Sequence, residues 1–192
     1  NEGAFVSPAP TADPGQTRLF YNGQVITGDS NPLTPVTTAL LVRGDKIEAV
    51  GAEAERLSRR EPATILIDLQ GRVLMPGFVD AHTHVLNDAQ AQGKSLDQAQ
   101  MLALQSGITT LGDLYVDQGF LRRIQALAQA GQLRVRTSLY LVHNDPCGEL
   151  YGDWWKAYPP TRVPGEMLRV NGVKIFLDGG SCGGVALSFE RA

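Results

Sequence analysis

The chain has 192 residues, of which 43% are hydrophobic and 19% are charged, a composition typical of a globular protein with a buried core. Its formal net charge is −3, and its basic residues form no run longer than the pairs Arg59-Arg60 and Arg122-Arg123. This balance excludes nucleic acid as an expected partner. No apolar stretch approaches the roughly 20 residues of a membrane span, so we expect a soluble protein without membrane contacts.

Residues 1–16 are rich in Pro, Ala and Gly and begin without Met. Three origins stay open for this segment: a flexible tail, the trimmed stub of an export signal, or residues added for expression. The compartment therefore stays open between the cytoplasm and the periplasm. The chain has two cysteines, Cys147 and Cys182, which are too few and too unpatterned for a disulfide framework, so we expect free thiols.

Residues 17–72 are expected to form a small β-rich subdomain. Short apolar or alternating runs are separated by turn formers such as Asn22-Gly23 and Gly44-Asp45, the pattern of a small antiparallel sheet. The runs are Leu19-Phe20-Tyr21, Val25-Ile26-Thr27, Ala39-Leu40-Leu41-Val42, Ile47-Glu48-Ala49-Val50 and Ile65-Leu66-Ile67. Residues 52–60 are expected to add one short helix.

The pattern changes after Gly71, and residues 73–192 are expected to form the first four β/α units of an α/β barrel. The predicted strands are 78–81, 108–114, 135–142 and 173–177, with helices over 95–105 and 120–130. Such alternation favours a parallel sheet. Four units are half of a (β/α)₈ TIM-type barrel, and an open half-barrel leaves unpaired strand edges. We therefore expect a fragment, completed by a missing C-terminal half or by a second copy, and a homo-oligomer.

The segment Leu74-Met75-Pro76-Gly77-Phe78-Val79-Asp80-Ala81-His82-Thr83-His84 carries the strongest chemical signal. Residues two apart in a strand point the same way, so His82 and His84 present both imidazoles on one face, at the carboxyl end where barrel enzymes place their sites. Paired neutral imidazoles suit zinc and similar divalent ions. The alternative is two histidines on a solvated turn. We predict metal ligation, since these are two of only three histidines and they close an apolar strand.

This histidine motif, preceded by a β-rich segment opening with Tyr21-Asn22-Gly23-Gln24-Val25-Ile26-Thr27, resembles the amidohydrolase superfamily from about Thr17 onward. The resemblance implies a β-sandwich flanking a (β/α)₈ barrel and one or two divalent metal ions, with zinc the expected ion. In that superfamily, the first barrel strand supplies two histidines to the metal. A lysine on strand four, histidines on strands five and six, and an aspartate on strand eight supply the other ligands, and only the first four strands are expected here.

Lys174 lies in the apolar segment 171–181, Asn-Gly-Val-Lys-Ile-Phe-Leu-Asp-Gly-Gly-Ser. A lone ammonium there needs a partner, a water-filled cavity or a change of charge, and the alternative is a lysine snorkelling at a strand start. The resemblance implies that Lys174 is carbamylated by CO₂ and bridges two metal ions, a catalytic and metal-ligating role. The sequence of this segment is similar to that of N-substituted formamide deformylases. The following residues, Ser181-Cys182-Gly183-Gly184, depart from the Ser-Leu-Gly-Ser expected there.

Further candidates lie at the ends of the predicted strands. His143 ends the third strand and is expected to bind substrate or orient a metal-bound water, with a structural hydrogen-bonded role as the alternative. Asp178 ends the fourth strand and Asp113 the second. We predict substrate binding or loop ordering for Asp178, and a supporting role for Asp113. Asp80 precedes the ligands and is expected to orient His82 or a neighbouring strand.

An aromatic, proline-bounded loop contains Trp154, Trp155 and Tyr158. Loops at this end of a barrel line substrate pockets, but packing against the helical ring is the favoured interpretation.

These features predict a metal-dependent hydrolase that cleaves a carbon–nitrogen bond, in an amide or N-acyl small molecule, through a metal-activated water. The resemblance places the acid/base aspartate on strand eight, so the 192-residue chain alone is expected to be inactive. Two alternatives stay open. One is a non-catalytic oligomerising or binding scaffold, and the other is a deaminase or a cyclic-amide hydrolase on the same fold.

Overall fold

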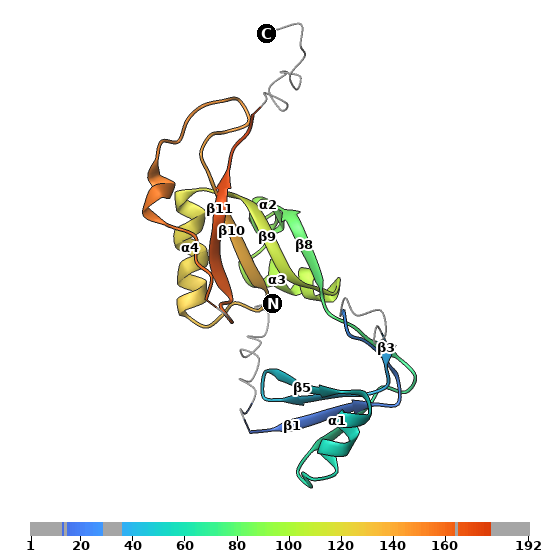
Figure 1. Cartoon of the computed structure of the whole chain (residues 1–192). Helices are drawn as coiled ribbons and strands as arrows, with labels where there is room; N and C mark the ends of the chain where they lie inside the picture. The colour runs from blue at the N-terminus through green and yellow to red at the C-terminus, as the bar shows by residue number, and fades with distance from the viewer. Residues whose placement is uncertain (1–12, 14, 29–35, 164, 178–192) are drawn as a thin grey trace, which may run out of the picture. The chain divides into compact units, whose positions relative to one another are not determined.

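The computed structural model describes residues 13, 15–28, 36–163 and 165–177. It divides into two compact units, with the boundary between Pro76 and Gly77 (Figure 1). The limit at residue 72 predicted from sequence lies just before the last short strand of unit 1. The segment 1–16 falls almost wholly outside the described residues.

Unit 1 is built from two small sheets, one with strand order β5-β4-β1-β6 and one with order β3-β2-β7. The strands are β1 Thr17–Tyr21, β2 Gln24–Ile26, β3 Val36–Thr37, β4 Leu40–Arg43, β5 Lys46–Val50, β6 Ile65–Asp68 and β7 Val73–Leu74.

The prediction of one small antiparallel sheet is wrong for unit 1. Both sheets are mixed, because β1 pairs with β6, and β2 with β7, in parallel. Helix α1, Gly51–Ser58, carries the chain from β5 to β6, and a helical crossover is the usual connection that leaves two strands parallel. Its Ala54 is buried with Leu19, Ala39 and Leu41 in a small core.

Unit 2 contains a four-stranded parallel sheet in the order β11-β10-β9-β8. Its strands are β8 Phe78–Thr83, β9 Ile108–Val116, β10 Arg136–Val142 and β11 Leu168–Lys174. Its helices are α2 Val85–Ala91, α3 Leu96–Gln105, α4 Gln118–Gln129 and the 3₁₀ helix η1 Trp154–Ala157. Strands and helices alternate, so the α/β class is confirmed, while a closed barrel stays a prediction.

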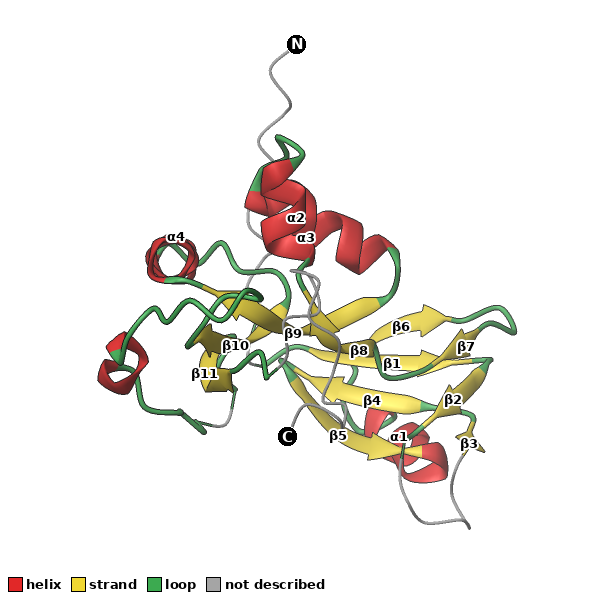
Figure 2. Cartoon of the chain, turned by 90° about the horizontal axis from the view of Figure 1, so that it is seen from above, coloured by secondary structure: helices red, strands yellow, loops and turns green. Residues whose placement is uncertain are grey.

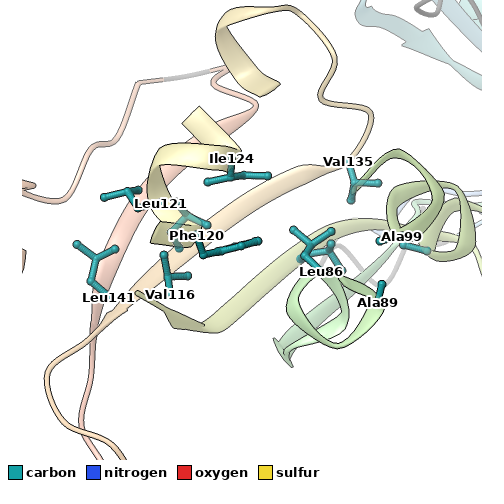
Figure 3. Packing of buried hydrophobic residues seen from close by; sticks show 12 residues of the cluster. Leu86, Ala89, Ala99, Val116, Phe120, Leu121, Ile124, Val135 and Leu141 are labelled. Atoms are coloured by element: carbon teal, nitrogen blue, oxygen red, sulfur yellow. The ribbon is translucent and has the colours of Figure 1, made fainter. Parts of the chain in front are cut away.

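Helices α2, α3 and α4 lie on the same side of this sheet (Figure 2). The core between helices and sheet is apolar, with Phe120, Leu121 and Ile124 of α4 packed near Val116 and Leu141 (Figure 3). Helices α3 and α4 begin at polar caps, since the Ser95 side chain accepts a hydrogen bond from the Gln98 amide and Asp117 accepts one from the Phe120 amide. Such caps satisfy amides that have no partner within a helix.

The fourth strand differs most from its prediction. It was expected over residues 173–177, but β11 runs from Leu168 to Lys174, so Lys174 is the last residue of the strand. Asn171 and Gly172 form part of the strand, opposite a register shift in β10 between Leu139 and Tyr140. A Cβ at Gly172 would lie 3.3 Å from the Tyr140 ring, so glycine allows this close approach.

Two smaller differences concern helix α2 and Cys147. Helix α2 was not predicted, because its few apolar residues are too short a pattern to mark a helix. Cys147 is disulfide-bonded, so the free-thiol prediction is wrong for this residue, since two cysteines far apart in sequence carry no spacing signal for pairing. Cys182 lies outside the described residues. Among the described helices, none is both long and apolar enough to cross a membrane.

Candidate metal centre

His82 and His84 lie at the carboxyl end of β8. His82 is the penultimate residue of the strand, and His84 is the residue that precedes helix α2. The two ring centroids are 5.6 Å apart, with an angle of 89° between the ring planes. With zinc–nitrogen bonds of about 2.0–2.1 Å, two imidazoles on one ion have centroids roughly 5 to 6 Å apart. The observed separation is compatible with two imidazoles on one divalent ion.

The Asp80 carboxylate is hydrogen-bonded to the backbone of the segment that carries these rings. Its Oδ1 accepts a hydrogen bond from the His82 amide at 3.3 Å, and Thr83 Oγ1 accepts one from the Val85 amide at 3.2 Å. Both bonds hold the segment in which the strand becomes helix α2. Asp80 thus contacts the backbone of His82, which is one way to orient the histidine.

The electrostatic surroundings of His84 favour its neutral form. Burial lowers the pKa of His84, and the positive charges of His82 and Lys174 lower it further, whereas Asp88 acts in the opposite direction. The neutral imidazole is the form that ligates a metal. His84 Nδ1 is buried and has no hydrogen-bond partner among the described residues. A metal ion, or an acceptor from residues beyond the described part, would satisfy this nitrogen.

Lys174 is the last residue of β11, which lies at the opposite edge of the four-stranded sheet from β8. Its Nζ lies 4.6 Å from the centroid of the Phe176 ring, and within the described residues it forms no ion pair with a carboxylate. The Phe176 ring in turn lies 6.1 Å from the Tyr115 ring, and the Tyr115 ring lies 6.1 Å from the His84 ring, between centroids. The fold therefore brings Lys174 toward the histidine pair, although about 90 residues separate them in the sequence.

His143 follows the last residue of β10, and both its backbone and its ring are held. Its amide donates to the Lys174 carbonyl oxygen at 3.0 Å, and its carbonyl oxygen accepts from the Tyr151 amide at 2.8 Å. Its Nδ1 accepts a hydrogen bond from Trp155 Nε1 at 3.1 Å. Asp178, the other residue predicted to bind substrate, lies outside the described residues.

The two tryptophans of η1 are partly buried against the core of unit 2, together with Tyr158. Trp154 Nε1 donates to the Val142 carbonyl oxygen at 3.1 Å. Packing, the favoured interpretation of this aromatic loop, is therefore confirmed. The contact between Trp155 and His143 was not predicted.

Sequence reasoning also missed three aromatic residues beside the candidate metal centre. The Tyr115 ring lies 6.1 Å from the rings of both His84 and Phe176, between centroids. The Tyr115 and Tyr151 hydroxyls are 3.4 Å apart, and this hydrogen bond is the main cause that raises the pKa of Tyr151 to about 12. Tyr115 is the penultimate residue of β9. Its position near the end of a predicted strand could have identified it as a candidate site residue from the sequence.

Asp113 lies inside β9 and not at its end, because β9 continues to Val116. Its side chain is fully buried. Its Oδ1 accepts a hydrogen bond from the Tyr115 amide at 3.2 Å, whereas Oδ2 has no partner among the described residues. Burial raises the pKa of Asp113 to about 7, and the charge of Asp88 adds to this effect.

Among the described residues, no three His, Cys, Asp or Glu side chains converge in a metal-binding group. The described part of the candidate metal centre therefore consists of two imidazoles and a nearby lysine. This set lies at the carboxyl ends of parallel β/α strands, which is where metal-dependent hydrolases with barrel folds place their sites.

Several known enzymes match part of the chain in sequence. It is 29% identical over 94 residues to a dihydroorotase of Lactobacillus gasseri, a match that covers 49% of this chain and 18% of the relative. It is 37% identical over 97 residues to an imidazolonepropionase of Symbiobacterium thermophilum, covering 49% and 21%. It is 34% identical over 67 residues to an N-substituted formamide deformylase of Arthrobacter pascens, covering 35% and 12%. No protein-family model matches the chain.

The fold agrees with these matches. An uncharacterized metal-dependent hydrolase of Pyrococcus furiosus superposes with a TM-score of 0.67 at 15% identity, covering 84% of this chain and 56% of that structure. In sequence and fold the chain is thus similar to members of the amidohydrolase superfamily, the family that the histidine motif resembles. The matched segments cover about a fifth or less of the curated relatives.

Proposed function

We propose that the full-length protein is a metal-dependent hydrolase that cleaves a carbon–nitrogen bond in a small amide or N-acyl compound. The observation that carries this proposal is the pair of imidazoles at the end of β8, with ring centroids 5.6 Å apart. The sequence relatives support it, because they are enzymes of the superfamily in which such a pair is expected.

We assign His82 and His84 to hold a divalent ion, with zinc as the expected ion. Burial lowers the pKa of His84 and so favours the neutral ring, which is the state that ligation requires. The bound ion would lower the pKa of a water molecule and polarise the substrate carbonyl.

Lys174 is proposed as a third ligand after reaction of its amine with CO₂. As an ammonium, Lys174 disfavours a positive charge on His84. A carbamate would instead carry a negative charge and attract the divalent ion. The half-buried side chain has no carboxylate partner within the described residues, so no ion pair has to be broken for this modification.

His143 and Asp178 are proposed to bind the substrate. His143 lies at the same end of the sheet as Lys174, to which its backbone is bonded. The acid that protonates the leaving nitrogen is proposed to come from the remainder of the full-length protein or from a second copy of the chain.

Metal analysis of the full-length protein tests the assignment. We expect one or two divalent ions per chain in the wild type and a loss of bound metal in His82→Asn and His84→Asn. His143→Gln is the matched control, because it removes the third histidine without removing a proposed ligand, and it should keep the metal. Two results would favour a non-catalytic scaffold instead: a full metal content in His84→Asn, or no bound metal in wild-type protein that was produced in the presence of zinc.

The carbamate is tested separately by native mass spectrometry at alkaline pH, where the adduct is stable. We expect the mass of one CO₂ on wild type and none on Lys174→Ala. In the Lys174→Ala variant, short carboxylic acids should restore part of the activity, since they supply the missing anionic oxygen ligands. Wild-type activity toward a cyclic amide or an aminopurine, but toward no open-chain amide, would favour the alternative reactions on this fold.

A further inference from the structure

We propose that Trp155 is a positioning residue that fixes His143 as the neutral tautomer with its proton on Nε2, so that His143 offers an N–H donor to a substrate oxygen. The second half of this proposal rests on the proposed hydrolase function. The first half concerns only the state of the His143 ring and does not depend on any activity.

The hydrogen-bond chemistry of the pair determines the tautomer. Trp155 Nε1 and His143 Nδ1 are 3.1 Å apart, and the two rings meet edge to face with centroids 6.1 Å apart. An indole N–H can only donate, so His143 Nδ1 must supply a lone pair. In a neutral imidazole the one proton then lies on Nε2.

Both partners are held in place from several sides. Trp155 packs against the core of unit 2, and its neighbour Trp154 ties η1 to the end of β10 through the Val142 carbonyl oxygen. The backbone of His143 is bonded to Lys174 on one side and to Tyr151 on the other. The ring can therefore lose this tautomer only at the cost of the indole hydrogen bond.

The opposite edge of the ring is available to a ligand. His143 is partly exposed, and its Nε2 has no hydrogen-bond partner among the described residues. An N–H at this position can donate to a carbonyl oxygen and to the oxyanion that develops from it. A proton on Nδ1 would break the bond to Trp155, so this edge of the ring is expected to act as a donor. Of the two roles predicted for His143, binding a substrate oxygen matches a donor at Nε2, whereas orienting a metal-bound water would require this N–H to donate to the water oxygen.

Nitrogen-15 NMR of the full-length protein, labelled at histidine, measures the tautomer directly. We expect wild-type His143 to show a protonated Nε2 and an unprotonated Nδ1 at neutral pH, with His143→Gln used to assign the signals. In Trp155→Phe the signals should move toward a mixture of tautomers. Trp154→Phe is the matched control, because it removes an adjacent indole donor that does not reach His143, and it should retain the wild-type tautomer.

The wild-type spectrum alone can overturn the proposal: a proton on His143 Nδ1 would do so whether or not the variants fold. Unchanged signals in Trp155→Phe would also overturn it, because the indole would then not be the cause of the tautomer.

Kinetics test the second half. With an amide substrate, Trp155→Phe and His143→Asn should each lower kcat/KM roughly tenfold or more, the loss expected for one hydrogen bond to a developing charge. The double variant should lose little beyond His143→Asn, since Trp155 acts through His143. Additive losses would refute the positioning role. Absence of activity in the wild type would refute the hydrolase function. The tautomer of His143 would then still be tested by the NMR measurement.

Discussion

Asp113 should make the stability of this protein depend on pH. Its carboxyl is fully buried in β9, with one oxygen bonded to the Tyr115 amide and the other without a partner in the described chain. Burial raises its pKa from 3.8 to about 7. One pKa unit corresponds to about 1.4 kcal/mol, so ionising this group in the folded protein costs about 4 kcal/mol relative to the unfolded chain.

The direction follows from the two pKa values. Below pH 3.8 the carboxyl is protonated in both the folded and the unfolded state, and it makes no pH-dependent contribution. As the pH rises from 3.8 toward 7, the unfolded state ionises while the folded state keeps its proton, so the free energy of unfolding falls. Above about pH 7 the folded state ionises too, and the loss is complete.

Urea unfolding of metal-free full-length protein between pH 5 and 8.5 tests this reasoning. Asp113→Asn keeps the shape of the side chain but cannot ionise, and its buried amide costs about 1–3 kcal/mol if it finds no acceptor. We expect the variant to be less stable than wild type near pH 5 and to gain on it by roughly 2 kcal/mol or more by pH 8.5. Leu111→Ala, a neutral change in the same strand, should destabilise by the same amount at every pH. A constant difference between Asp113→Asn and wild type over this range would refute the raised pKa.

Three further changes test how the strand ends and the core are held. The buried Asn144 side chain donates to the Phe176 carbonyl oxygen at 2.8 Å and accepts from its amide at 2.9 Å, so Asn144→Leu should cost roughly 2–4 kcal/mol in urea unfolding and speed hydrogen exchange at the Phe176 amide. Replacing the fully buried Phe120 with alanine should lower the free energy of unfolding by about 3–5 kcal/mol in the same assay. A decrease below about 1 kcal/mol would mean that the side chain contributes little to the core. Removing the α4 cap in Asp117→Ala should cost about 1 kcal/mol, and Asp117→Ser should restore most of it.

Several features follow from residues close together in the chain, and for these the sequence is sufficient. The two-residue period of a strand puts His82 and His84 on one face, and the rings do lie side by side. Ser95 and Gln98 form a capping box at the start of α3, as neighbours within one helical turn can. The alternation of strands and helices in unit 2 likewise rests on local apolar periodicity, so the α/β class was predictable.

Other features depend on which distant segments pack together. No local pattern shows that β6 returns parallel to β1, or that β11 begins at Leu168 and makes Lys174 its last residue. The same is true of Asp113, whose raised pKa comes from burial in β9, where it pairs with Leu139 of β10 and Thr83 of β8.

The sequence by itself therefore determined the residue types at the candidate metal centre and the strand that carries two of them. Only the tertiary structure decided that Lys174 approaches His84 and that Trp155 bonds to His143. The physical reason is range: caps, turns and side-chain alternation depend on residues a few positions apart, whereas burial, the pKa of a carboxyl and the tautomer of a ring depend on what the folded chain places next to them.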